Sequence, residues 1–202
     1  MSLSHCRGCA TPRQSTMNQK RNIKFLEKKE IDRIINTIPD DLRGRRDRAL
    51  LSVLFSTGLR IGEALKLMRN VMLAEDAIRT LELSIIGKGN WQRTVYISPV
   101  ALKAVLRYFA ARSDDDDRVF PITIRCAQKM VKQRAKEAGV NKFISPHVFR
   151  HSFATNLLRR GANIYYVQQF LGHRSLSSTQ EYLHVVNSDL IKIHKEIYGS
   201  DK

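Results

Sequence analysis

Helical hydrophobic patterns run through most of this 202-residue sequence, and one stretch changes to the two-residue period of β-strands. In that stretch Leu83 and Ile85 alternate with more polar neighbours. After the glycine-containing turn 87–90, Val95 and Ile97 repeat the alternation. Alternation on both sides of a short glycine-rich turn predicts a β-hairpin. One hairpin among helices limits the fold class to mainly α (α+β) with a small antiparallel β-sheet.

Residues that favour helix ends bound the helical patterns on both sides of this stretch. Ser98-Pro99 and Ser145-Pro146 each give an N-cap followed by proline at the first helical position. Gly58 is expected to end an earlier helix as its C-terminal cap. The expected helices cover roughly residues 31–38, 46–56, 60–65, 99–109, 124–138, 146–160, 163–172 and 189–198, with residue 182 in a further segment.

The charge balance narrows the class of partner. The sequence has 35 Lys+Arg against 19 Asp+Glu, a formal net charge of +16. An excess of this size favours a polyanionic partner, with nucleic acid first and an anionic membrane surface second. The membrane interpretation is weaker because no apolar run approaches the ~20 residues that cross a bilayer. The N-terminal residues also lack the apolar core of a signal peptide, so we expect a cytoplasmic protein.

The first 24 residues are basic, contain no acidic residue and show no sustained periodicity. This composition predicts a disordered arm, either a solvated tail or a segment that lies along a phosphate backbone. Within it, Cys6 and Cys9 beside His5 supply at most half of a zinc site, and Cys126 lies far away in a helical pattern. Reduced thiols are the preferred interpretation, and neither a metal nor another cofactor is expected.

A histidine and an arginine share one face of the helix that begins at Pro146. His147 and Arg150 are three residues apart, so both can contact one small anion. Their place in the first turn adds the free N–H groups and partial positive charge of a helix N-terminus. Taken alone, such a pair is more often a surface pair without a role. Together with the residues that follow, it predicts a phosphate-sized site.

A tyrosine follows this pair at a distance that lets it return to the same site. Tyr182 lies nine residues after His173, far enough for a short turn and a further helix. Tyrosine is a weak nucleophile while protonated, because its reference pKa is ~10. Surrounding cations favour the phenolate without any metal. The candidates that could supply positive charge or proton transfer are Arg60, Lys88, Arg150 and the two histidines.

Five segments, in this order, resemble the catalytic domain of tyrosine recombinases of the phage integrase and Xer type. Each motif alone is weak, whereas five in the family's order are highly specific. They are Thr57-Gly-Leu-Arg-Ile-Gly-Glu63, Ile86-Gly-Lys-Gly89, Ser145-Pro-His-Val-Phe-Arg-His-Ser-Phe-Ala-Thr155, Leu171-Gly-His173 and Ser178-Thr-Gln-Glu-Tyr-Leu-His184. The resemblance implies a helical DNA breaking–rejoining domain.

The resemblance implies which residues would hold the scissile phosphate. Arg60 matches the first arginine of the family and Arg150 the second, which together clamp the non-bridging oxygens. His173 matches the position that hydrogen-bonds the phosphate. Glu63 matches a carboxylate that supports the first arginine.

The resemblance also implies the reacting groups. Tyr182 matches the nucleophile, Lys88 the lysine that protonates the leaving 5′-oxygen, and His147 the histidine that helps to deprotonate the tyrosine. Tyr165 and Tyr166 are instead interpreted as helix packing. The implied reaction is two transesterifications through a 3′-phosphotyrosyl link, which conserves the phosphodiester energy. No ATP is then required, and the sequence contains no GxxxxGK[ST] phosphate loop.

The same resemblance implies the partners and the domain division. Double-stranded DNA is the expected substrate, with a monomer in solution, a homo-tetramer on synapsed DNA, and association with the nucleoid. The length and a hydrophobic content of 43% fit one compact domain. We assign it to residues 25–186, after the basic arm 1–24. Residues 187–202 are expected to form a tail helix that docks on a neighbouring protomer.

Two departures from the family pattern stand out, and two other functions remain open. The N-terminal helical domain that usually closes around DNA does not precede these residues, as in an excised catalytic domain or a short natural form such as the fimbrial phase-switch recombinases. Residues 69–73 replace an acidic turn, so a loop of uncertain form is expected there. The alternatives are a type IB topoisomerase and a catalytically silent DNA-binding module, and neither explains the full set of motifs as well.

Overall fold

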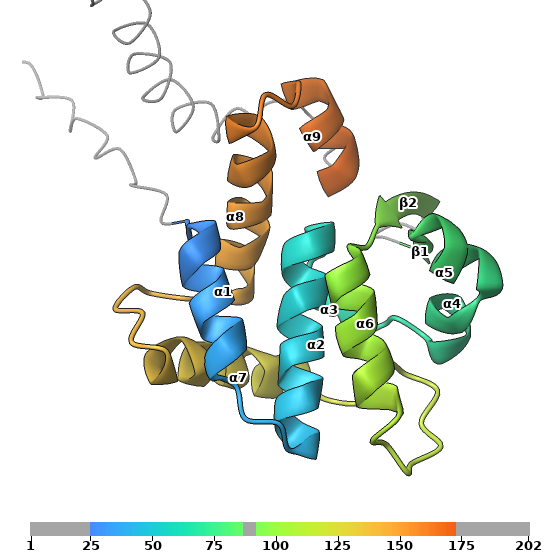
Figure 1. Cartoon of the computed structure of the whole chain (residues 1–202). Coiled ribbons are helices and arrows are strands. Elements are labelled where there is room, and N and C mark those ends of the chain that lie inside the picture. The colour runs from blue at the N-terminus through green and yellow to red at the C-terminus, as the bar shows by residue number, and fades with distance from the viewer. Residues whose placement is uncertain (1–24, 87–91, 173–202) are drawn as a thin grey trace, which may run out of the picture.

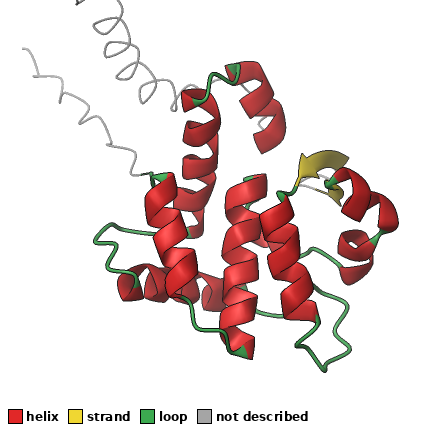
Figure 2. Ribbon diagram, viewed as in Figure 1, coloured by secondary structure: helices red, strands yellow, loops and turns green. Residues whose placement is uncertain are grey.

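Helices pack around one central helix, α2, in the computed structural model, which describes residues 25–86 and 92–172 (Figure 1). α2 lies between α1 and α6 and also packs against α8. A β-hairpin stands to one side with the short helices α4 and α5 (Figure 2). The described helices are α1 (Lys28–Thr37), α2 (Leu42–Thr57), α3 (Ile61–Ala64), α4 (Arg69–Leu73), α5 (Glu75–Thr80), α6 (Pro99–Phe109), α7 (Ile124–Glu137), α8 (Pro146–Arg159) and α9 (Ile164–Leu171).

The central position of α2 follows from its sequence. Residues 49–54 are buried without interruption, so no face of this part of the helix is turned to solvent. The helix begins four residues before the expected start at residue 46, because the Asp41 carboxylate accepts a hydrogen bond from the Gly44 N–H at 2.7 Å. It ends, as predicted, at Gly58, which has a left-handed φ of 64°.

Most of the other expected helix ends are confirmed. The Ser98 hydroxyl accepts from the Ala101 N–H at 3.2 Å, and Pro99 is the first residue of α6. Asn163 caps α9 through the Tyr165 N–H at 2.9 Å. Pro146 begins α8 after Ser145, but the Ser145 side chain makes no capping hydrogen bond among the described residues.

The hairpin is confirmed and has two strands, β1 (Glu82–Ile86) and β2 (Gln92–Tyr96), paired antiparallel. Leu83 lies opposite Val95, and both side chains are buried, so one face of the hairpin joins the core. The predicted loop at 69–73 is instead the helix α4, followed by α5. Met72 and Ala77 are buried, which anchors this helical pair beside the hairpin.

The core divides into a large cluster and a small one. The large cluster extends from α1 to the start of α8 and includes Phe120 and Phe149, both fully buried. The small cluster joins α8 to α9 through Ala154, Leu158 and Val167, together with Leu171. The end of α9 is therefore held against α8 by apolar packing. Over the described ranges, no helix combines the length and apolar character needed to cross a bilayer.

Candidate active site

The first predicted arginine, Arg60, stands at the N-terminus of α3, two residues after the left-handed turn at Gly58. Its backbone N–H donates to the Glu63 carboxylate at 2.8 Å. Its guanidinium also pairs with that carboxylate, with 3.2 Å between Nη1 and Oε1. The side chain nevertheless remains 42% exposed, so its charge is accessible from solvent. Glu63 thus contacts both the backbone and the guanidinium of Arg60.

A second arginine, Arg93 on β2, binds the same carboxylate. Its Nη1 lies 3.3 Å from Oε1 of Glu63 and its Nη2 lies 3.0 Å from Oε2, a two-point contact. The side chains of Arg93 and Glu63 are only 11% and 10% exposed. Sequence reasoning missed Arg93, because the two residues are 30 positions apart and no spacing rule connects a strand to a helix start. The only sequence signal is its place in the hairpin, five residues after Lys88.

The electrostatic environment keeps Glu63 ionised. Burial is the largest single effect and by itself would raise the pKa of this carboxyl. The hydrogen bond from the Arg60 backbone and the charges of Arg93 and Arg60 act in the opposite direction and prevail. The pKa of Glu63 is therefore lowered below its ordinary value, and the site contains one carboxylate between two guanidinium groups.

The second predicted arginine, Arg150, is buried in the first turns of α8 with 5% of its surface exposed. Its Nη1 donates to the Gly58 carbonyl at 2.7 Å and its Nη2 to the Leu171 carbonyl at 2.6 Å. These two bonds tie α8 to the loop that carries Arg60 and to the last residue of α9. Arg150 therefore lies against the backbone turn that precedes Arg60 by two residues.

The C-terminal end of α9 lies close to Arg93 and also contacts Arg150. Gly172 caps α9 with a left-handed φ of 61°. A Cβ at this position would lie 2.8 Å from Cζ of Arg93, so the glycine allows a close approach to that guanidinium. Leu171, one residue earlier, accepts from Arg150. Segments far apart in sequence, from α3, β2, α8 and α9, therefore converge at one place.

The remaining predicted residues fall into two groups. His147 is exposed as the second residue of α8, three residues before Arg150 on the same helix. Lys88, His173 and Tyr182 lie outside the described residues, as do the cysteines of the N-terminal arm. Within the described residues, no group of three His, Cys, Asp or Glu side chains could hold a metal ion, and Cys126 is an exposed free thiol.

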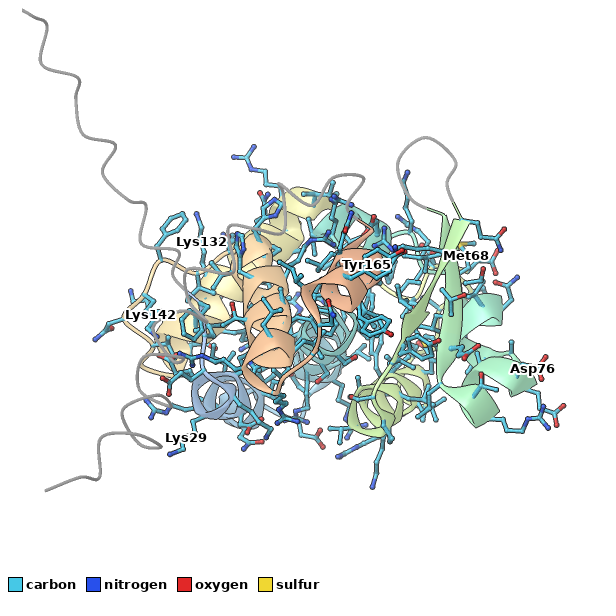
Figure 3. All side chains as sticks on the ribbon, turned by 90° about the horizontal axis from the view of Figure 1, so that it is seen from above. Lys29, Met68, Asp76, Lys132, Lys142 and Tyr165 are labelled. Atoms are coloured by element: carbon cyan, nitrogen blue, oxygen red, sulfur yellow. The ribbon has the colours of Figure 1, made fainter. Side chains whose placement is uncertain are left out.

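The expectation that Tyr165 and Tyr166 pack inside the protein is wrong. They are 55% and 62% exposed, and Figure 3 shows Tyr165 on the surface of α9. Val167 and Leu171, four residues apart, take the buried face of this short helix instead. Because α9 has only one buried face, two adjacent aromatic residues beside it are left on the outside.

Sequence comparison decides the family. The model of the phage integrase family matches residues 24–188. The chain belongs to this family. The phage integrase match includes all the residues that converge in the structure and also Lys88, His173 and Tyr182.

Relatives within this phage integrase family include two named tyrosine recombinases. XerD of Halalkalibacterium halodurans is 34% identical over 193 residues, which are 89% of this chain and 63% of the relative. XerC of Leptospira interrogans serovar copenhageni is 33% identical over 187 residues, covering 88% of this chain and 59% of the relative. The chain therefore spans about three fifths of the length of these curated relatives.

Solved structures show the same fold. The crystal structure of XerA recombinase superimposes with a TM-score of 0.72 at 29% identity, covering 94% of this chain and 67% of that one. XerH recombinase bound to a palindromic difH substrate, a post-cleavage complex, gives 0.72 at 24% identity over 85% and 52%. The mainly helical fold with its small hairpin is thus the fold of recombinase structures.

Proposed function

We propose that this chain is the catalytic unit of a site-specific DNA recombinase that cleaves and rejoins DNA through a 3′-phosphotyrosyl intermediate. The observation that carries the proposal is the hydrogen bond from Arg150 to the Gly58 carbonyl, because it joins α8 to the turn that lies two residues before Arg60. Two guanidinium groups suit the two non-bridging oxygens of a phosphodiester. Arg60 supplies the more accessible charge and Arg150 the more rigidly held one.

The other proposed roles follow the family motifs by position. Tyr182 is the proposed nucleophile and Lys88 the proposed acid for the leaving group. His147 is the proposed proton acceptor for the tyrosine, and His173 a proposed hydrogen-bond donor to the phosphate. The exposure of His147 beside Arg150 on α8 supports its share in the proposal. The proposed role of His173 is supported by the residue before it, because Gly172 lies beside Arg93.

The proposed reaction conserves one phosphodiester at each step. The Tyr182 oxygen forms a bond to phosphorus while the bond to the 5′-oxygen breaks. The phenol proton goes to His147, and the leaving oxygen takes a proton from Lys88. In the second step a 5′-hydroxyl attacks the phosphotyrosine, and the same groups act in reverse. Positioning and charge stabilisation around the pentacoordinate phosphate then account for the catalysis.

A stripe of basic side chains on α7 supports DNA as the proposed substrate. Arg125, Lys129 and Lys132 are exposed and spaced for one face of the helix. The N-terminus of α7 contacts α3, where Ile124 lies near Gly62. The stripe therefore begins next to the Arg60 segment, and we propose that it contacts phosphates that flank the scissile one.

Binding of duplex DNA is expected to weaken steeply with salt, because cationic side chains displace condensed counterions. Lys129→Gln should reduce the slope of log K against log[salt] by about 1, the contribution of one phosphate contact. Lys103→Gln, an exposed lysine of α6 away from the stripe, is the matched control and should leave the slope unchanged. Fluorescence anisotropy between low and moderate salt measures both. Equal slopes for the two variants would show that Lys129 on α7 does not contact a DNA phosphate.

The larger assembly is also part of the proposal. We assign residues 25–186 to the catalytic unit, and propose that the basic arm 1–24 follows the DNA backbone. Residues 187–202 are proposed to dock on a neighbouring protomer in a tetramer on synapsed DNA, formed from monomers. XerD, XerC and XerH, to which the chain is similar, are named recombinases. No contact among the described residues favours a type IB topoisomerase or a catalytically silent DNA-binding module.

Trapping the covalent intermediate tests the proposed function. On nicked duplexes that tile the DNA flanking the gene, cleavage releases a short fragment with a free 5′-hydroxyl. This fragment diffuses away, so the protein remains attached to the 3′-phosphate. A gel-shifted adduct that survives denaturant is expected on at least one duplex. Mass spectrometry should then locate the nucleotide on the peptide that contains Tyr182. An adduct on another tyrosine would reject the proposed nucleophile, and plasmid relaxation without strand exchange would instead indicate a topoisomerase.

A further inference from the structure

Arg93 holds an unusual position for a residue outside the family's catalytic motifs. It is nearly buried, binds both oxygens of Glu63, and lies against Gly172 at the end of α9. A surface ion pair would contribute little to stability, but this pair is shielded from solvent at the point where the site segments converge. Its location therefore suggests a role in the site.

Counting charges shows what Arg93 changes. Arg60 and Glu63 alone sum to zero, so a phosphate that approached Arg60 would also meet the carboxylate that neutralises it. With Arg93 the group sums to +1. The geometry divides the three residues accordingly, because Arg93 contacts both carboxylate oxygens while the Arg60 guanidinium contacts one, at 3.2 Å, and stays 42% exposed.

We propose that Arg93 is a positioning residue that neutralises Glu63, so that Glu63 orients Arg60 without cancelling the charge that Arg60 offers to the scissile phosphate. This inference rests on the proposed function for its phosphate. Arg93 itself acts through Glu63 and Arg60. Because it also belongs to β2, the same contact fixes this strand against α3.

Variants that change and then restore the summed charge of Arg60, Glu63 and Arg93 separate this role from simple structural support. Arg93→Gln leaves the Glu63 carboxylate to Arg60 alone, and we expect the first-order cleavage rate at saturating DNA to fall by roughly 10²-fold. Adding Glu63→Gln restores the sum of +1 and also removes a buried carboxylate that has lost one of its two guanidinium partners. The double variant should therefore recover at least about tenfold of the lost rate, although it has lost two native side chains. If Arg93 had only a structural role, the second substitution would lower the cleavage rate further.

Arg134 provides a matched control elsewhere in the fold. Its side chain is 13% exposed and binds the buried Asp47 carboxylate with Nε at 2.9 Å and Nη2 at 2.8 Å. This pair joins α2 to α7 through two donors from one guanidinium, as Arg93 does for Glu63. Arg134→Gln should reduce thermal stability to a similar extent but leave the cleavage rate of the folded protein unchanged.

A second measurement needs no DNA. The guanidinium N–H signals of Arg60 can be followed by NMR while inorganic phosphate is added. We expect phosphate to bind roughly tenfold more weakly in Arg93→Gln than in the wild type, and to regain its affinity in the double variant. If Arg93→Gln binds phosphate as the wild type does, or if Glu63→Gln gives no rescue, the inference is overturned.

The two readouts distinguish this inference from the proposed function. If the wild type forms no adduct on any duplex while the phosphate affinities follow the summed charge of the three residues, the recombinase proposal fails, but the effect of Arg93 on phosphate binding at Arg60 stands. If the wild type cleaves DNA and Arg93→Gln cleaves and binds phosphate equally well, the recombinase proposal stands and the role of Arg93 is rejected.

Discussion

Replacing Arg150 with glutamine is expected to lower the rate of covalent DNA cleavage by about 10³-fold, the upper range for loss of one preorganised donor to a developing charge. The same change should destabilise the fold by about 2–4 kcal/mol, because hydrogen bonds from a charged group to two carbonyls are lost. Those carbonyls belong to Gly58 and Leu171. Single-turnover cleavage of the nicked duplex and urea denaturation measure the two effects.

Arg150→Lys separates charge from geometry. Lysine keeps the positive charge but lacks the planar fork that can reach two carbonyls and an anion together. We expect most of the cleavage defect to persist. Tyr182→Phe gives the background signal of the cleavage assay, because it removes the proposed nucleophile and leaves all the basic side chains in place. Arg159→Gln, at the far end of α8, should cleave like the wild type. Similar rates for Arg150→Gln and Arg159→Gln would remove Arg150 from the proposed site.

The local features of the fold could be predicted because each depends on a few neighbouring residues. The hairpin follows from alternation around a turn, and the ends of α6 and α9 follow from Ser98, Asn163 and Gly172. The start of α2 was misplaced, because Asp41 precedes a polar stretch that shows no hydrophobic period. α4 was missed for a related reason, since a five-residue helix is too short to show one.

Residues of the candidate site could be proposed from the sequence only where a motif contains them. The motifs suggest roles for Arg60 and Arg150, yet the hydrogen bond that joins their two segments runs from Arg150 to the Gly58 carbonyl. A backbone acceptor of this kind cannot be recognised from the sequence. Arg93 was missed because its partner is set by the packing of β2 against α3. Long-range pairing of this kind depends on tertiary structure, which neither periodicity nor composition specifies.

The second large effect is expected at Gly58, where alanine should destabilise the fold by about 2–5 kcal/mol. A left-handed φ of 64° costs an L-residue roughly 1–2 kcal/mol. A Cβ there would also lie 2.7 Å from Cε1 of Phe153, and overpacking of that kind adds about 1–3 kcal/mol. The shift in the urea midpoint at unchanged slope measures the sum.

Comparison with Gly139→Ala isolates the contribution of the Phe153 ring to the cost of Gly58→Ala. Gly139 has nearly the same φ, 68°, but a Cβ there would meet nothing within 4 Å, so only the backbone cost of roughly 1–2 kcal/mol is expected. The Gly58 carbonyl, unlike that of Gly139, accepts from Arg150, and Arg60 follows two residues later. A backbone shift forced by Phe153 must therefore move both arginines. Cleavage per folded molecule should fall in Gly58→Ala and stay unchanged in Gly139→Ala, and equal rates would show that the turn only holds the fold together.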